Sequence, residues 1–317
     1  MQPILSRLLL LLLCYATALP AQQLNDDPHD ARFVYEDIGR FWMAFDSAQG
    51  KPEDRQQAIY QSIYIDPATV GFRSWLDKRE KSVAELVSGV NSMLPFYRSL
   101  RTNMDHLTDY ERDMRAGFYA LEYLYPEARF PDVYFFVWHF FATGSTTTDV
   151  GLMIAAETQT VSDSTPLDAI PEIHRPMVRS MDLASLAGVA VHESVHEQQP
   201  DFDTENLLEL ALREGTADFI AELCTGSIPS YAVHAYADSR RQELWEEFKE
   251  KMYTDNYAGW RFIPEDRPAG LAYWMSYQIA EAFYRQAADK RQAVRELIES
   301  TDYRDIFIRS RYAEQFD

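Results

Sequence analysis

Apolar and aromatic residues recur every three or four positions through the first third of the chain, which is the spacing of one face of a helix. The clearest run is Phe33, Ile38, Phe41, Trp42 and Phe45. The pattern predicts mostly helical structure over residues 30–129, with most of these aromatic side chains in the core. Within this region, residues 78–90 are predicted to form a further amphipathic helix.

The pattern changes in the middle of the chain. Residues 133–141 are an aromatic and β-branched run without polar alternation, which is typical of a buried strand. Residues 144–149 are rich in Gly, Ser and Thr and predict a turn. The apolar residues 150–156 then predict a second strand that pairs with the first, so we expect a small β-sheet here.

Helical patterns return after Asp182, which is a candidate N-cap for the first of these helices. They predict helices over residues 182–199, 204–225, 238–253, 268–287 and 290–299. The Pro- and Asp-rich residues 162–176 are either a linker or a loop within one unit. The predicted fold class is α+β and mainly helical, with the small sheet packed on the helix at 182–199 and a helical C-terminal part.

The N-terminal residues have the pattern of an export signal. Arg7 precedes the apolar run 8–13, and small residues follow over 16–21, so we predict a signal peptide over residues 1–21 that is removed. The apolar run is too short to cross a bilayer core of about 30 Å. We therefore expect a secreted or periplasmic protein with no stable membrane insertion after removal of the signal.

Cysteine usage and charge narrow the function classes further. Cys14 follows Leu13 rather than a small residue, so we expect no lipid on it, and Cys224 alone remains in the mature chain, which excludes an internal disulfide. The formal net charge of −20 would repel nucleic acid, so no nucleic-acid partner is expected. The sequence leaves the oligomeric state open.

The helix predicted over 182–199 carries the strongest chemical motif. His192 and His196 are four residues apart, so both imidazoles project from one face about one turn apart and can hold a single metal ion. Glu193 stands beside them, where its carboxylate can act as general base toward a water activated by the metal. The motif therefore predicts a metal-dependent hydrolase.

The next predicted helix supplies a third ligand. A catalytic zinc site has three protein ligands and an open position, and Glu214 is placed to complete the set. Asp218, one turn further, can orient a liganding histidine by accepting its second ring proton. The alternative, in which Asp218 itself is the third ligand, stays open.

His192-Glu193-x-x-His196 followed by Glu214-x-x-x-Asp218 resembles the gluzincin pattern of thermolysin-like and aminopeptidase-like zinc peptidases. Within that group the chain is most similar to predicted exported zinc-dependent proteases of a domain family of unknown function. The resemblance implies a zincin-like fold and Zn²⁺ as cofactor. It also implies His192, His196 and Glu214 as ligands, Glu193 as general base and Asp218 as the residue that orients a histidine.

The resemblance rests on residues 185–225, with weaker similarity over 267–273. Seventeen residues separate His196 from Glu214, one fewer than in the aminopeptidase pattern, so the loop that joins the helices differs. We expect one zincin-like catalytic unit over 22–317. Its first part, residues 22–165, holds helices and the small sheet, and residues 180–317 form the zinc-binding helical part.

Hydrolysis of an amide also needs a donor for the developing oxyanion, and in related peptidases a Tyr or His supplies it. Tyr273 is the preferred candidate, ahead of Tyr277, Tyr231 and His234. The predicted function is an exported zinc peptidase acting on a peptide or protein substrate. The alternatives are a zinc amidase on a non-peptide substrate and a non-catalytic, zinc-containing binding or assembly protein.

Overall fold

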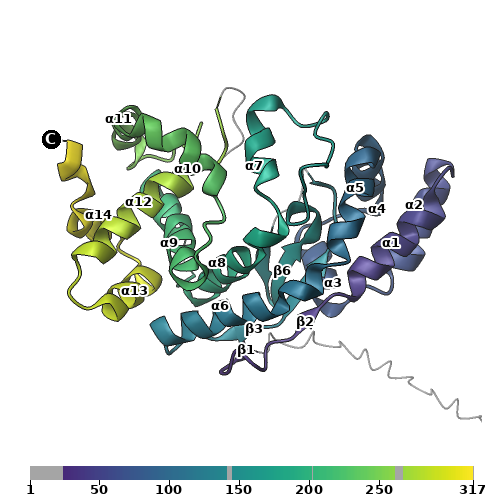
Figure 1. Cartoon of the computed structure of the whole chain (residues 1–317), viewed down its shortest axis with the longest axis horizontal. Helices are drawn as coiled ribbons and strands as arrows, with labels where there is room; N and C mark the ends of the chain where they lie inside the picture. The colour runs from purple at the N-terminus through teal and green to yellow at the C-terminus, as the bar shows by residue number, and fades with distance from the viewer. Residues whose placement is uncertain (1–23, 141–144, 202, 261–266, 317) are drawn as a thin grey trace, which may run out of the picture.

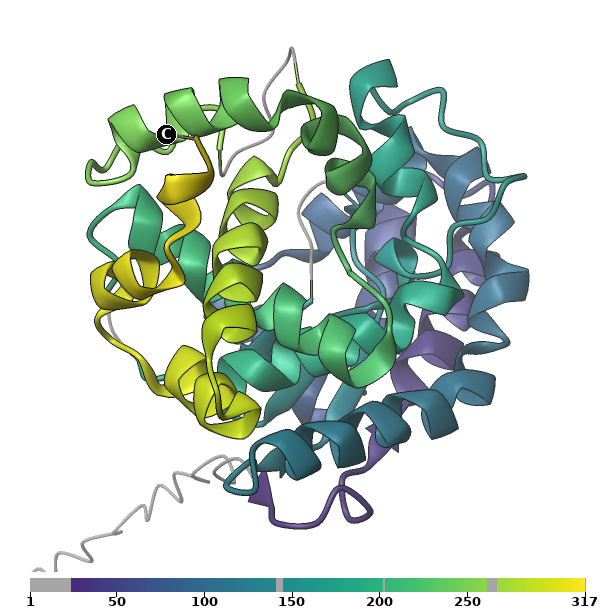
Figure 2. The same ribbon diagram turned by 60° about the vertical axis from the view of Figure 1, so that its left-hand side comes forward.

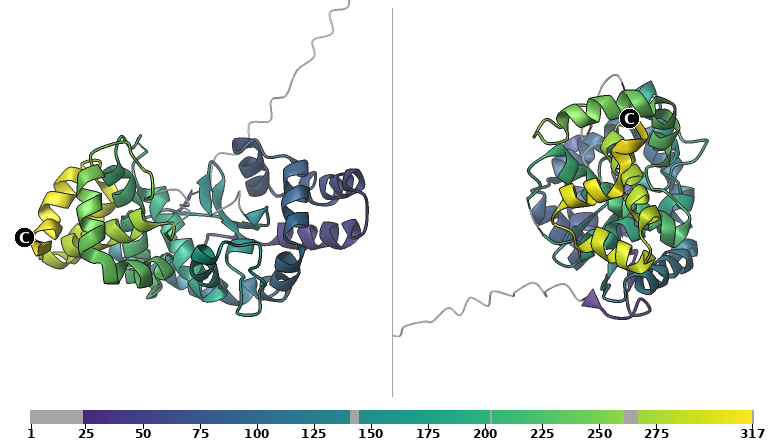
Figure 3. Two further views of the ribbon diagram at one scale, coloured as in Figure 1. Left: turned by 90° about the horizontal axis from the view of Figure 1, so that it is seen from above. Right: turned by 90° about the vertical axis from the view of Figure 1, so that its left-hand side faces the viewer.

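The computed structural model describes residues 24–140, 145–201, 203–260 and 267–316. The signal peptide predicted over 1–21 lies outside them. The described chain is mainly helical with a small β-sheet, as the sequence predicts (Figure 1). Viewed from above, the strands lie between the N-terminal helices and the C-terminal helices (Figure 3).

Helices make up most of the region between the first strands and residue 129, as expected. They are α1 (Glu36–Ala48), α2 (Glu53–Tyr60), α3 (Val70–Lys78), α4 (Val83–Ser92), α5 (Leu94–Met104) and α6 (Glu111–Leu124). The helix predicted over 78–90 begins too early. Residue 78 is the last residue of α3, and the expected helix begins only at Val83. It begins there because Ser82 caps it by accepting a hydrogen bond from the Glu85 backbone N–H.

The main sheet has the strand order β2-β4-β6-β5 among the described residues. Its strands are β2 (Phe33–Val34), β4 (Val133–Phe136), β5 (Thr146–Thr148) and β6 (Gly151–Ala155), and β1 (Leu24–Asn25) pairs separately with β3 (Phe130–Pro131). The predicted pairing of the two apolar runs is confirmed, and β4 and β6 run parallel. Both strands are buried along their whole length, which explains their lack of polar alternation.

The first predicted strand is shorter than expected. It ends at Phe136, because two tyrosine hydroxyls take over the backbone groups that follow. Tyr64 Oη donates to the Val137 carbonyl at 2.6 Å and accepts from its N–H. Tyr97 Oη bonds the backbone of residues 138 and 140 in the same way. A bonded loop therefore replaces the end of the predicted strand.

The turn predicted over 144–149 is wrong in its described part. Thr146–Thr148 is strand β5, antiparallel to β6, and the chain reverses only at Asp149 and Val150. β5 stands at the end of the strand order, whereas β4 is internal. Both β5 and β6 contact the helix that carries the histidines.

The C-terminal helices follow the predicted order. The helix predicted over 290–299 is confirmed with those bounds, and the other four predicted helices start three or four residues later than expected. They are α7 (Arg175–Arg179), α8 (Leu186–Gln198), α9 (Leu207–Thr225), α10 (Tyr231–Ala237), α11 (Arg241–Lys251), α12 (Leu271–Gln286), α13 (Lys290–Glu299) and α14 (Tyr303–Ser310). Asp182 caps the 3₁₀ turn that leads into α8, as expected of it. α9 begins at Leu207 rather than near 204, because Asn206 caps it by accepting from the Glu209 backbone N–H. The helices α7, α10 and α14 were not predicted.

Residues 162–176 form a packed loop. Thr165, Leu167 and Ile170 within it are buried, which is unusual for a flexible linker. The loop leads into α7, which contacts α10. These contacts favour a loop over a linker for this segment.

Close packing of α8, α9 and α12 places the site. Figure 2 shows α12 running beside the middle of the molecule, where it packs along α9, while α6 packs across α8 and α9. Gly215 on α9 allows the close approach of α12, because a Cβ at this position would overlap Ser276 and the backbone of Tyr277. A side chain is therefore excluded one residue after Glu214.

A partly exposed ion pair braces the region before α12. The Glu247 carboxylate on α11 accepts from the Arg267 guanidinium at 2.7 and 2.8 Å and from the Trp260 indole at 3.0 Å. The hydrogen bonds from Arg267, assisted by Lys251, lower the pKa of Glu247 to about 2.

Candidate metal centre

α8 and α9 bring three predicted ligands together. His192 and His196 lie one turn apart on α8, and their Nε2 atoms are 3.1 Å apart. Glu214 Oε2, from α9, lies 3.1 Å from His196 Nε2 and 3.5 Å from His192 Nε2. The three atoms thus form a nearly equilateral triangle at the contact between the two helices.

The spacing of this triangle fits a tetrahedral zinc ion. Zinc bonds of about 2.0–2.1 Å at tetrahedral angles separate neighbouring ligand atoms by about 3.3 Å. The separations of 3.1–3.5 Å between the Nε2 and Oε2 atoms bracket that value. Three protein ligands also leave a fourth tetrahedral position for water or substrate.

Hydrogen bonds fix the tautomer of His192. Its Nδ1 lies 2.8 Å from Oδ1 of Asp218, which is fully buried on α9. A carboxylate only accepts, so in the neutral imidazole Nδ1 carries the proton and the lone pair is on Nε2. Ser230, just before α10, donates to the other oxygen of Asp218. Both carboxylate oxygens of Asp218 are therefore engaged away from the triangle.

Gln199 fixes the tautomer of His196, a role that the sequence did not predict. Its Nε2 donates to the Arg213 carbonyl at 2.9 Å, so its Oε1 faces His196 Nδ1, at 2.7 Å. Nδ1 must then donate, and Nε2 again keeps its lone pair. Gln199 also connects the end of α8 to the residue before Glu214. Its position three residues after His196 is the one feature of the sequence that could have indicated this role.

The hydrogen bonds of the two Nδ1 atoms explain why a cation fits between His192, His196 and Glu214. With the ring protons on both Nδ1 atoms, two Nε2 lone pairs and a carboxylate oxygen face one another within 3.5 Å. Such an arrangement repels itself unless a positive charge lies in it. Glu214, not Asp218, faces the two histidines, which separates the two alternatives for the third position.

The titration behaviour of the cluster follows from the same contacts. Burial lowers the pKa of His192, but the hydrogen bonds to Asp218 and Glu214 outweigh it and raise the pKa well above its ordinary value. Burial raises the pKa of Glu214, but the neighbouring His196 and His192 outweigh it, and the pKa lies well below its ordinary value. A proton and a metal ion thus compete for the same lone pairs.

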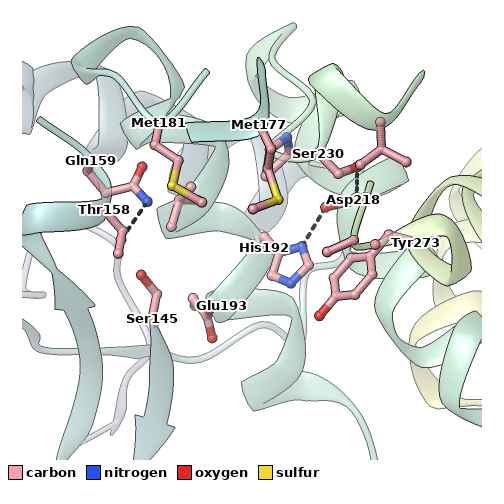
Figure 4. Close-up of a pocket in the computed structure, with 15 residues that line it drawn as sticks. Ser145, Thr158, Gln159, Met177, Met181, His192, Glu193, Asp218, Ser230 and Tyr273 are labelled. Carbon is pink, nitrogen blue, oxygen red and sulfur yellow. Dashed lines mark hydrogen bonds and ion pairs between the residues drawn. The ribbon is translucent and has the colours of Figure 1, made fainter. Parts of the chain in front are cut away.

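Glu193 is buried beside the histidines and lines a pocket. Burial raises its pKa, and the charges of His192 and His196 oppose the shift. A carboxylate whose affinity for protons is raised in this way is suited to take up and release one. Figure 4 shows Glu193 and His192 along the same side of the pocket.

Tyr273 is the one predicted oxyanion donor that lines this pocket, as far as the described residues show. Its ring stacks on that of His192, with 6.2 Å between centroids and 13° between planes. Burial first, and then the charges of Glu214 and Asp218, raise the pKa of its hydroxyl well above the ordinary value, so it stays a donor. The other three candidates, Tyr231, His234 and Tyr277, are not among the described residues that line the pocket.

Their contacts explain why these other candidates are poorly placed. The Tyr277 hydroxyl donates to Glu222, Tyr231 is 65% exposed, and His234 is buried against the ring of Tyr277. The tertiary structure therefore leaves Tyr273 as the candidate for the oxyanion donor.

The pocket beside His192 and Glu193 has a volume of about 360 Å³. It is enclosed by α7, α8, α10, the start of α12 and the residues that follow β6 (Figure 4). The lining residues are Ser145, Thr158, Gln159, Met177, Met181, Val189, His192, Glu193, Asp218, Pro229, Ser230, Val233, Ala269, Gly270 and Tyr273. A volume at the lower end of ligand pockets suits one side group of a larger molecule.

Fold and site together define a mainly helical α+β protein built around a two-histidine, one-glutamate cluster suited to a metal ion. The chain belongs to the family described as gliding motility protein GldB, whose model matches residues 34–314. The match includes every residue of the cluster. No curated protein and no solved structure matches the chain.

Family membership bears on the predicted location. The family is one of lipoproteins, which fits an exported protein of the cell envelope. Cys14 precedes the matched residues, so the expectation that it carries no lipid stays a prediction. Within the described part of the chain, no helix combines the length and apolar character needed to span a membrane. The family description names motility and no reaction, so the resemblance to zinc peptidases also stays a prediction.

Proposed function

We propose that the chain is an exported zinc-dependent hydrolase that cleaves amide bonds in the cell envelope, with a zincin-like arrangement of its site and a peptide or protein as substrate. The observation that carries the proposal is the triangle of His192, His196 and Glu214 with Glu193 beside it. A bound zinc ion would supply a Lewis acid that polarises the substrate carbonyl and lowers the pKa of water to about 7.

The protein's own groups would carry the proton and the charge. Glu193 takes the proton of the attacking water, and its raised pKa favours holding that proton until the leaving amine accepts it. Tyr273 donates its hydroxyl hydrogen toward the developing oxyanion. Asp218 and Gln199 keep the two imidazoles in the required tautomer.

The sheet supports an extended peptide as substrate. β5 has β6 as its strand neighbour, and its other edge has no strand partner among the described residues. Ser145, which directly precedes β5, lines the pocket beside Glu193. An edge strand next to the reacting groups can hold an extended chain by backbone hydrogen bonds. The internal strand β4 is excluded from this role, because β2 and β6 occupy both of its edges.

A non-catalytic, zinc-containing role in binding or assembly is the second candidate, and the motility description of the family favours it. Structural zinc sites are usually closed by four Cys or His ligands. The cluster has three ligand residues and adjoins a pocket, which favours the hydrolase.

Zinc content and turnover, measured on the same variants, test the proposal. Elemental mass spectrometry should give about one zinc per chain, lost in His192→Ala and Glu214→Ala. Glu193→Gln should keep the zinc and lose at least about 100-fold in turnover of a fluorogenic peptide library. Glu243→Gln, on the exposed face of α11, is the matched control. Zinc binding without turnover of peptides or other amides would favour the assembly role, and absence of zinc would refute both.

A further inference from the structure

The apolar part of the pocket is the feature that points beyond the proposed reaction. Met177, Met181, Val189, Pro229, Val233 and Ala269 supply its apolar lining. They come from separate segments of the chain, so the tertiary fold creates this surface. Figure 4 shows the thioethers of Met177 and Met181 directed toward the space beside His192.

Most polar groups in the same wall are already engaged. Thr158 donates to a backbone carbonyl at 2.8 Å. Gln159 donates to Thr158 at 3.2 Å and accepts from Ser185 at 3.1 Å. Ser230 donates to Asp218. The buried Ser145 hydroxyl is the exception, since it has no hydrogen-bond partner among the described residues. Apart from it, an entering group would meet a wall that offers little further hydrogen bonding.

The charges that remain are all of one sign. Glu193 and Asp218 are the acidic residues of the lining, and among the described lining residues there is no Lys or Arg. An anionic group would lose its hydration and face two carboxylates. A cationic group would find Asp218 already bonded to His192 and Ser230.

We propose that this pocket binds an uncharged, aliphatic side group of the substrate next to the bond that is cleaved, and that Met177 and Met181 set this preference. The inference rests on the proposed function and names the substrate class of that site. Methionine side chains adapt to different apolar shapes. The pocket should therefore exclude anionic groups sharply and distinguish aliphatic groups from one another only weakly.

Three hydroxamates provide a test that does not depend on turnover, because a hydroxamate binds a metal directly. Acetohydroxamate has no side arm, 4-methylpentanohydroxamate adds four aliphatic carbons, and succinic monohydroxamate carries a carboxylate of similar reach. Binding is measured by calorimetry on the zinc-loaded full chain, with a chelator-treated sample as the metal-free control. The aliphatic arm should tighten binding about 30-fold or more over acetohydroxamate, and the carboxylate arm should not tighten it.

A charge placed in the pocket should change the preference. Met177 is partly exposed on α7, so Met177→Lys is compatible with folding. It should weaken the aliphatic probe and tighten the carboxylate probe, which changes their ratio by at least about tenfold. Met43→Lys, the same substitution at a 62% exposed position on α1, should leave the ratio unchanged.

The outcomes separate the two proposals. If acetohydroxamate binds but the aliphatic arm adds less than about threefold, or Met177→Lys leaves the ratio unchanged, the pocket assignment is wrong while the metal site stands. If none of the three probes binds the zinc-loaded chain, the site has no open position, and the proposed function is refuted together with this inference.

Discussion

The bond between His192 and Asp218 gives the most direct test of how the site is built. Asp218→Asn keeps the size of the side chain and removes its charge. The amide oxygen can still accept from His192 Nδ1 and the amide nitrogen can face Ser230, so the fold should survive. What is lost is a charge-assisted hydrogen bond, 2.8 Å long and without solvent exposure on the aspartate side.

The size of the effect follows from that loss. A hydrogen bond to a charged group contributes about 1.5–3 kcal/mol and a neutral one about 0.5–1.5 kcal/mol, so Asp218→Asn should cost about 1–2 kcal/mol of zinc binding. This agrees with the roughly 10- to 100-fold loss of affinity typical when residues behind metal ligands are changed. Zinc at about 100 times the wild-type Kd stabilises the fold by about 2.7 kcal/mol. With a loss of about 1–2 kcal/mol, the same zinc concentration should stabilise the variant by only about 0.9–1.8 kcal/mol.

Chelator competition gives the zinc Kd, and urea unfolding with and without zinc gives the stabilisation. Asp238→Asn is the matched control, since Asp238 accepts from the Trp274 indole at 3.0 Å outside the cluster. Its zinc Kd should equal that of the wild type. A zinc Kd within about threefold of wild type for Asp218→Asn would refute the idea that this carboxylate orients a metal ligand.

Three further changes test other parts of the structure. Gln199→Leu removes the acceptor of His196 Nδ1 and should weaken zinc about 10-fold by chelator competition, and Gln199→Glu, which keeps an acceptor, should recover most of the loss. Glu247, whose pKa is lowered to about 2, should stabilise the fold above about pH 4.5 and lose that contribution as the pH falls toward 2. Glu247→Gln should therefore cost about 1–2 kcal/mol at about pH 7, allowing for solvent screening, and flatten the acid limb of urea stability curves; an unchanged limb would contradict this. Gly215→Ala should destabilise by about 2 kcal/mol or more in urea, whereas Gly39→Ala, which has open space at its Cβ, should not; equal stabilities would contradict the close helix packing.

The sequence alone predicted the features that depend on local pattern. The helical class, the two paired apolar strands and the cap at Asp182 follow from periodicity and composition over short stretches, and the structure confirms them. The strand that ends at Phe136 was overextended, because hydroxyls from distant helices bond the next residues and no local pattern reveals such partners. The short helix α10 and the strand β5 were missed for a related reason, since tertiary contacts outweigh weak local preference in short elements.

The site divides in the same way. The four-residue spacing by itself places His192 and His196 on one helix face, because helix geometry is local. Only the packing of α9 on α8 decided that Glu214 faces them and that Asp218 lies behind His192. Gln199, Ser230 and the methionine-lined pocket likewise depend on segments far apart in the chain. The sequence therefore determined which residues are suited to the chemistry, and the tertiary structure decided which of them meet, because side chains on different elements are positioned only by long-range packing.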